Sequence, residues 1–309
     1  MNTNSLLEGF RILDFSHRLP GPLAGHALAL FGAQVIKIED IKFGDPFENG
    51  TFSSFDNSFL SWYKELNRLK EIKKIDFNSP ECKREILDLL KISDAIIVSV
   101  PDKIQGQLGI DNKTLVDLNL SIAKVELGAS NEHKVSMHDL NALCMAGLLG
   151  MHITGRTNDI IDPPFLPISG IAFGQNVATQ ILAGILKAKK SQNFCFSNCY
   201  IYETARDILG TFLPDSVKAN GQKKFLHNGA YPCYSIYRTK DNRYVALAAV
   251  EEKFWESFQK QFAISIEAKD RFNTDKTTFE KVSAAIKNLT ITEIKAKIQD
   301  HDVCLSVID

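Results

Sequence analysis

One stretch of the sequence decides the fold: Phe10-Arg-Ile-Leu-Asp-Phe-Ser-His-Arg-Leu-Pro-Gly-Pro-Leu-Ala-Gly-His-Ala-Leu-Ala-Leu-Phe-Gly-Ala-Gln-Val-Ile-Lys-Ile-Glu-Asp40. The apolar runs over residues 11–15 and 35–38 predict two buried parallel strands. Between them, a Pro/Gly turn over residues 19–22 leads into an Ala- and Leu-rich helix over residues 23–31. The turn after the first strand of such a βαβ unit is where phosphate-bearing ligands commonly bind.

The same alternation of strand and helix continues along the chain. We predict strands near residues 74–77, 94–100 and 120–127, and helices over 58–66, 79–90, 111–119, 138–151 and 173–189. After these, residues 234–238 and 243–248 predict an antiparallel hairpin, followed by helices over 253–261, 278–288 and 292–300. The fold class is therefore α/β, with a parallel Rossmann-like large domain over residues 1–219 and a smaller α+β domain over 220–309.

Charge and composition argue against several classes of binding partner. The net charge of −1 gives no general attraction to nucleic acid or to an anionic membrane, and no apolar run is long enough to span a bilayer. The first residues lack the pattern of a signal peptide. The six cysteines are scattered without a CxxC pair or zinc spacing, which favours small buried side chains over a metal or redox site. We expect a cytoplasmic protein with no metal, no nucleic acid and no membrane partner.

Several blocks in a fixed order carry a family resemblance. They are Leu13–Pro22, Gly32–Glu39, Gly44–Pro46, Asn67–Lys70 with Ile75-Asp76, Leu108–Ile110, Met137–Asn141, Ile236–Thr239, Ala249–Phe254 and Asp302–Val307. Together they resemble the family III CoA-transferases (CaiB/BaiF), and most closely the α-methylacyl-CoA racemase branch, over residues 7–309. The resemblance implies a CoA thioester as substrate, no tightly bound cofactor, acid/base or acyl-transfer chemistry, and a homodimer of interlocked rings.

The resemblance also implies catalytic residues. A racemase removes a proton beside a thioester and returns one to the opposite face, which requires two acid/base groups. The first matches His138, in a block that includes Asp139, and its expected orienting carboxylate matches Glu251. The structural alternative is that His138 caps a helix that begins at Asp139.

The second group of the family is an Asp, which the transferases also use to carry the acyl group. The matching position here is Gly170, which can neither accept a proton nor form a mixed anhydride. Asp159 and Asp162 lie upstream in the sequence. Two hypotheses follow: an enzyme that relies on His138 as its acid/base, or a non-catalytic relative that binds an acyl-CoA or acts as a partner subunit.

Candidate contacts to CoA come from the basic blocks. They are His17, Arg18, Asn67, Arg68 and Lys70, together with Lys103, which is the nearby cation where the family commonly has an Arg-Pro-Gly turn. For Arg68 and Lys70 a solvated charged turn is an equal alternative. The family usually continues past the strand near residues 303–307 with a return segment, so we expect weaker interlocking in this chain.

A nicotinamide dehydrogenase is a third reading, because the acids Glu39 and Asp40 after the second strand could bind ribose hydroxyls. The first turn argues against it. That turn lacks the GxGxxG spacing, and Pro20 and Pro22 remove backbone N–H groups that would bind a pyrophosphate.

Overall fold

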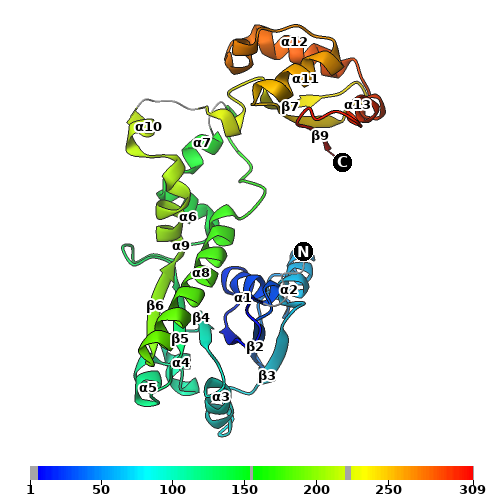
Figure 1. Ribbon diagram of the computed structural model, residues 1–309. Coiled ribbons are helices and arrows are strands. Elements are labelled where there is room, and N and C mark those ends of the chain that lie inside the picture. The colour runs from blue at the N-terminus through cyan, green and yellow to red at the C-terminus, as the bar shows by residue number, and fades with distance from the viewer. Residues whose placement is uncertain (1–5, 154–155, 220–223, 309) are drawn as a thin grey trace. The chain divides into compact units, whose positions relative to one another are not determined.

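The computed structural model describes residues 6–153, 156–219 and 224–308 (Figure 1). The chain divides into two compact units, the first extending to Pro214 and the second beginning at Asp215. Each unit has its own hydrophobic core.

The first unit is built on a parallel sheet. Its strands are β1 (Arg11–Phe15), β2 (Gln34–Asp40), β3 (Glu71–Ile75), β4 (Ala95–Val98), β5 (Ala123–Gly128) and β6 (Cys195–Tyr200). Their order in the sheet is β3-β2-β1-β4-β5-β6, and every neighbouring pair is parallel. This is the doubly wound order, and its direction reverses between β1 and β4. The expectation of a Rossmann-like parallel sheet is therefore confirmed.

Helices cover both faces of this sheet. Because side chains alternate along a strand, Ile12 packs with α1 (Pro20–Leu30) and α8 (Ile168–Ser191). Leu13 points to the other face, which is covered by α3 (Cys82–Leu90), α4 (Asp102–Leu108) and α5 (Asn112–Asp117). The remaining helices of the unit are α2 (Ser58–Asn67), α6 (Asp139–Met145), α7 (Leu149–Ile153), α9 (Ile201–Asp207) and η1 (Leu209–Phe212).

The starts of α1 and β3 differ from the prediction. Helix α1 begins at Pro20, inside the stretch predicted as a turn. Proline suits the first helical turn because its missing N–H would have no intrahelical partner there. Strand β3 begins three residues earlier than predicted because it pairs with β2 from the Ile36–Glu71 step onward.

Other corrections concern helices. The helix predicted over residues 138–151 is two helices, α6 and α7, separated at Gly147, whose φ of 77° is in the left-handed region. Residues 102–108 form α4, a helix that was not among those predicted. Helix α8 begins at Ile168, five residues before its predicted start at Phe173. Strand β6 and helix α9 were not predicted, because β6 is half-exposed and polar in sequence.

The second unit contains an antiparallel sheet of β7 (Tyr234–Arg238), β8 (Tyr244–Ala248) and β9 (Leu305–Ile308), in that order. The predicted hairpin is confirmed, with Asn242 in the left-handed region at its turn. The sheet packs with the helices through a core that includes Trp255, Phe258 and Ile294. The helices are α10 (Asp215–Ala219), η2 (Leu226–Asn228), α11 (Glu252–Phe262), η3 (Ala268–Phe272), α12 (Lys276–Lys287) and α13 (Ile291–Ile298). In the described part of the chain, none of the helices is both long and apolar enough to cross a membrane.

Candidate functional site

The candidate site lies at the carboxyl ends of β1 and β4, where the strand order reverses. In open α/β sheets the loops at such a point diverge and leave a crevice for ligands. Here the loop after β1 contains His17 and Arg18, and the loop after β4 contains Ser99. The backbone N–H of His17 donates a hydrogen bond of 3.3 Å to Ser99 Oγ, which ties the two loops together.

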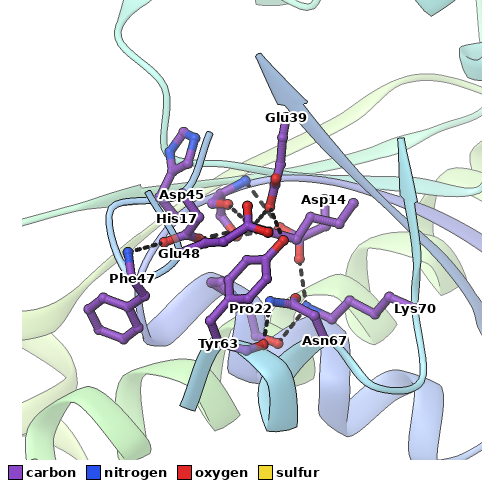
Figure 2. Close-up of polar contacts among 12 residues, drawn as sticks. Asp14, His17, Pro22, Glu39, Asp45, Phe47, Glu48, Tyr63, Asn67 and Lys70 are labelled. Carbon is purple, nitrogen blue, oxygen red and sulfur yellow. Dashed lines mark hydrogen bonds and ion pairs between the residues drawn. The ribbon is translucent and has the colours of Figure 1, made fainter. Parts of the chain in front are cut away.

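An ionic cluster of Asp14, Lys37, Glu39, Asp45 and Lys70 contacts this turn, and Figure 2 shows its members Asp14, Glu39, Asp45 and Lys70. Asp14 on β1 and Lys37 on β2 are register partners, so their side chains leave the sheet on the same face as α1. Lys37 Nζ lies 3.2 Å from Asp45 Oδ2 and 3.6 Å from Glu39 Oε1. Lys70 Nζ lies 2.9 Å from Asp14 Oδ2, and the side chains of both residues are fully buried.

The charges of the cluster shift one another's pKa. Burial opposes ionisation of Asp14, but the Lys70 and Lys37 ammonium groups outweigh burial and lower its pKa. Burial likewise opposes the charge of Lys37, and its three carboxylate neighbours outweigh burial and raise its pKa. For Glu39 burial dominates and raises the pKa, although Lys37 and a 3.0 Å hydrogen bond from Tyr63 Oη oppose it. The second carboxyl oxygen of Glu39 is buried without a hydrogen bond.

The ionic cluster fixes the shape of the turn after β1. Lys37 Nζ donates a 2.6 Å hydrogen bond to the carbonyl oxygen of Ser16. The Asp45 carboxylate accepts the backbone N–H of Arg18 at 3.0 and 3.2 Å and that of Phe47 at 3.0 Å. These hydrogen bonds hold Arg18 in a left-handed backbone conformation, with φ of 67°, which residues other than glycine rarely adopt. The turn is rigid because buried charges hold its backbone.

The amino end of α8 forms the second part of the site. Asp139 Oδ1 accepts the backbone N–H of Gly170 at 2.8 Å, so this carboxylate caps the long helix from outside. A Cβ atom on Gly170 would lie 2.9 Å from Leu19 Cδ2 and 3.8 Å from Asp139 Oδ1. A Cβ atom on Gly174, one turn further, would lie 2.8 Å from the carbonyl oxygen of Pro20. The structure thus brings Asp139 and Gly170 against the turn after β1.

Three catalytic candidates have different surroundings. His138 is the N-cap residue of α6, as the structural alternative predicted. Its backbone N–H donates a hydrogen bond of 3.1 Å to Asn141 Oδ1. Its side chain is exposed. Asp139 is half-buried, and burial raises its pKa against the lowering effect of the Gly170 and Ser169 N–H groups. Glu251 belongs to the second unit, where it is the exposed N-cap of α11, so its pairing with His138 stays a prediction.

Two of the expected CoA contacts are interior groups. The Lys70 ammonium group donates to Asp14 at 2.9 Å and to the carbonyl oxygen of Pro22 at 2.8 Å. Asn67 is buried, and its amide donates to the carbonyl oxygen of Tyr63 at 2.8 Å. The burial of the Lys70 side chain contradicts the solvated turn given as its alternative, and the contacts of Lys70 and Asn67 to CoA stay predictions.

The other expected CoA contacts remain accessible. Arg18 and Lys103 are exposed, and Arg68 is exposed with an ion pair of 3.3 Å to Glu65. His17 is half-buried, and burial and the charge of Lys37 lower its pKa. A neutral imidazole at this position suits hydrogen bonding better than a phosphate ion pair at neutral pH.

Sequence reasoning missed the roles of Lys37, Glu39, Asp45 and Tyr63. A signal was present for two of them, because Lys37 and Glu39 interrupt a run predicted as a buried strand, and buried charges need partners. No local pattern shows that Asp45 and Tyr63 supply such partners. Across the described residues, no group of three or more His, Cys, Asp and Glu is placed to hold a metal ion, and the cysteines are free thiols.

The strand order places the first unit in the class of open, doubly wound α/β sheets, a class in which ligands bind where the strand order reverses. The model of CoA-transferase family III matches residues 7–309, and the chain belongs to this family. It is 28% identical over 276 residues to a CaiB/BaiF CoA-transferase family protein of Caenorhabditis elegans, covering 86% of this chain and 75% of that protein.

Further relatives have more specific names. The chain is 28% identical to the succinyl-CoA:glutarate CoA-transferase of Mus musculus, covering 80% of this chain and 58% of the enzyme. It is 23% identical to the α-methylacyl-CoA racemase of the same species, covering 81% and 63%. The chain therefore spans less than two thirds of either enzyme. A CaiB/BaiF family protein from Brucella suis has the same fold, with a TM-score of 0.77 at 17% identity, covering 99% of this chain and 84% of that one.

Proposed function

We propose that this chain binds an acyl-CoA thioester at the crevice after β1 and moves a proton at the acyl α-carbon, with His138 as acid/base. The observation that carries the proposal is the contact chain from Asp139 through Gly170 to Leu19. It sets the residue next to His138 against the ligand-binding turn of the sheet. A reacting carbon held at this turn would have the imidazole of His138 and the carboxyl group of Asp139 as nearby acid/base groups.

The raised pKa of Asp139 supports a role in proton transfer. A carboxyl group whose pKa lies above its usual range holds a proton closer to neutral pH, which is the property required of a general acid. Glu251 is proposed as the carboxylate that orients the His138 imidazole. Lys103, Arg68 and His17 are proposed as contacts to the CoA moiety.

The experiment is exchange of the α-proton for deuterium in a 2-methylacyl-CoA, followed by mass spectrometry. The wild-type chain is compared with His138→Ala and with Asn141→Ala, a control that removes the neighbouring hydrogen bond to the His138 backbone. We expect exchange in the wild type and the control, and a loss of at least a hundredfold in His138→Ala. Equal exchange in His138→Ala would show that His138 is not the acid/base.

A second candidate function is that of a non-catalytic acyl-CoA-binding relative or partner subunit. Gly170 favours it, because no acid stands at the position where the family resemblance places one, and Leu19 crowds the space that a side chain there would need. Binding of CoA measured by calorimetry, without any α-proton exchange, is the result expected for this alternative.

We also propose a homodimer and a cytoplasmic location. Ile160 and Phe165 in the segment before α8 are 86% and 93% exposed, and Phe212 in η1 is 78% exposed. We propose that these exposed apolar side chains are covered by the second copy of the chain, as in protein interfaces that bury apolar patches. Light scattering after size exclusion, compared between the wild type and Phe165→Ser, tests this proposal, and the expected result is a dimer that the substitution weakens.

A further inference from the structure

One side chain of α9 holds the loop that follows β5. This loop, residues 129–137, leads into α6, whose N-cap is His138. Glu203 lies in the first turn of α9, and its carboxylate oxygen Oε1 accepts three hydrogen bonds from the loop. The donors are Ser130 Oγ at 2.8 Å, the backbone N–H of Asn131 at 2.9 Å and that of Glu132 at 3.2 Å. The carboxylate therefore fixes the backbone of the loop directly.

Neighbouring contacts attach the same part of the loop to α9. Ser130 Oγ also accepts the backbone N–H of His133 at 3.1 Å. The backbone N–H of Tyr202 donates to the carbonyl oxygen of Ala129 at 3.2 Å. The centroids of the His133 and Tyr202 rings lie 4.8 Å apart, with the rings edge to face. Residues 129–133 are thus bound to α9 through backbone, hydroxyl and ring contacts.

The helix that follows the loop rests on α9 as well. α6 packs on α9, and Ala142 and Ala205 are both fully buried in the core to which the two helices belong (Figure 1). α9 also packs on α8, where Asn176 Nδ2 donates to Thr204 Oγ1 at 3.0 Å. His138 lies in the chain between the loop and α6. The segment that carries His138 is therefore held by α9 on both sides of this residue.

Glu203 contributes more to this attachment than the ion pair beside it. Arg206, one turn further along α9, pairs with Glu132, but these side chains are 39% and 48% exposed, and an exposed ion pair contributes little. The second carboxyl oxygen of Glu203 is buried and has no hydrogen-bond partner in the described part of the chain. Hydrogen bonds to a charged acceptor are about twice as strong as neutral ones, and they strengthen away from water. The loop therefore depends chiefly on the Glu203 carboxylate.

We propose that Glu203 is a positioning residue, which attaches the loop after β5 to α9 and so holds His138 where its imidazole reaches the acyl α-carbon. This inference rests on the proposed function. Glu203 acts through the placement of His138 and exchanges no proton with the substrate. A reacting group displaced by about 1 Å can lose about a hundredfold in rate. Loss of the carboxylate should therefore lower the rate of proton exchange and leave the binding of CoA unchanged.

The test compares Glu203→Ala, Glu203→Gln and Ser130→Ala with the matched control Asp111→Ala. Asp111 likewise accepts a backbone N–H and a hydroxyl, both from Thr114 in α5, on the other face of the sheet. Three quantities are measured. They are the rate of α-proton exchange at saturating 2-methylacyl-CoA across the pH range, the dissociation constant of CoA by calorimetry, and the amide hydrogen exchange of residues 129–137 by mass spectrometry.

We expect Glu203→Ala to lower the rate of α-proton exchange by about tenfold or more. Its dissociation constant for CoA and the shape of its pH profile should match those of the wild type, while the amides of residues 129–137 exchange faster. Glu203→Gln keeps an acceptor oxygen and should stay within about threefold of the wild-type rate. Ser130→Ala removes one donor and should fall between these two variants. The control should match the wild type in all three measurements.

Four results would overturn the inference. A wild-type rate in Glu203→Ala would show that the loop does not position His138, and an equal fall in Asp111→Ala would trace the loss to general destabilisation. A changed pH profile in Glu203→Gln would assign Glu203 to proton transfer. If Glu203→Ala does not fold, a wild-type rate in Ser130→Ala overturns the inference in its place. The proposed function fails separately, through absence of α-proton exchange in the wild type, and this inference falls with it.

Discussion

The two sides of the candidate site are built in different ways. The turn after β1 is held from below by buried charges, with Lys37 and Asp45 contacting the backbone of Ser16, Arg18 and Phe47. The amino end of α8 is held by one carboxylate, that of Asp139, and has Gly170 where the resemblance expects an acid. The turn after β1 is thus fixed by several charged contacts, and the amino end of α8 by the carboxylate of Asp139 alone. The comparison teaches that the two sides depend on different contacts, so a substitution on one side should leave the contacts of the other in place.

The largest loss of stability is expected from a substitution in the ionic cluster that holds the turn after β1. Lys37→Met leaves Asp14, Glu39 and Asp45 buried with one cation fewer, and removing one partner of a buried pair costs about 3–5 kcal/mol in the free energy of unfolding. Urea unfolding in a Trp255→Phe background measures it, since the fluorescence then reports Trp62 of the first unit alone. The control is Lys91→Met, which removes an exposed ion pair with Asp88 and should cost less than about 1 kcal/mol. Similar costs for both variants would contradict the distinction between the two sides.

The next largest loss of stability is expected where α8 packs on α1. Gly174→Ala would place its Cβ atom 2.8 Å from the Pro20 carbonyl oxygen, which is backbone and moves only with the helix. We expect a loss of about 1–3 kcal/mol from overpacking. Gly170→Ala is the matched control, because its Cβ atom meets only the end of the Leu19 side chain, which can rotate. The gain in helix propensity should keep its effect within about 1 kcal/mol of zero. Equal losses in the two variants would show that Gly170 is required for packing and is no vacant catalytic position.

Part of the fold and of the candidate site could be predicted from the sequence, and part could not. The alternation of apolar runs was enough for the parallel sheet, because a buried strand imposes its pattern locally on residues such as Ile12 and Leu13. The start of α8 at Ile168 and the break at Gly147 were not predictable, since they depend on contacts of α8 with α1 and on one backbone angle. Among the candidate site residues, Arg18 and Asp139 were named in advance. The burial of Lys70 was not, because its partner Asp14 lies 56 residues away.

The capping carboxylate has a smaller effect on stability than on activity. Asp139→Ala removes the hydrogen bond to Gly170 N–H, and loss of a cap costs about 1 kcal/mol. Asp111→Ala is the matched control, since Asp111 caps α5 of the same unit by accepting the N–H of Thr114 at 2.9 Å. The two variants should be destabilised alike in urea. Only Asp139→Ala should lose α-proton exchange. Loss of exchange in both would trace the effect to general destabilisation of the unit.

The smallest effect is a change in the pH dependence of stability through Glu39. Its pKa is raised in the folded state, so the folded chain binds a proton more tightly than the unfolded chain, in which Glu titrates near 4.3. The contribution of Glu39 is therefore fully present below about pH 4 and is lost as the pH rises through the folded pKa. Asp14 has the opposite sign, because its pKa is lowered and its contribution is lost as the pH falls through that lowered value.

Glu39→Gln separates these two groups. The amide keeps an oxygen that can accept the Tyr63 hydroxyl but cannot ionise, so we expect the variant to lose the decline in stability above about pH 4. The loss of stability in strong acid should remain, because Asp14 is unchanged. Urea midpoints measured across the pH range test this, with Glu85→Gln as the control, because Glu85 pairs with Lys73 and lies outside the ionic cluster. A variant whose profile still declines like that of the wild type would show that Glu39 is ionised in the folded chain and that Lys37 outweighs its burial.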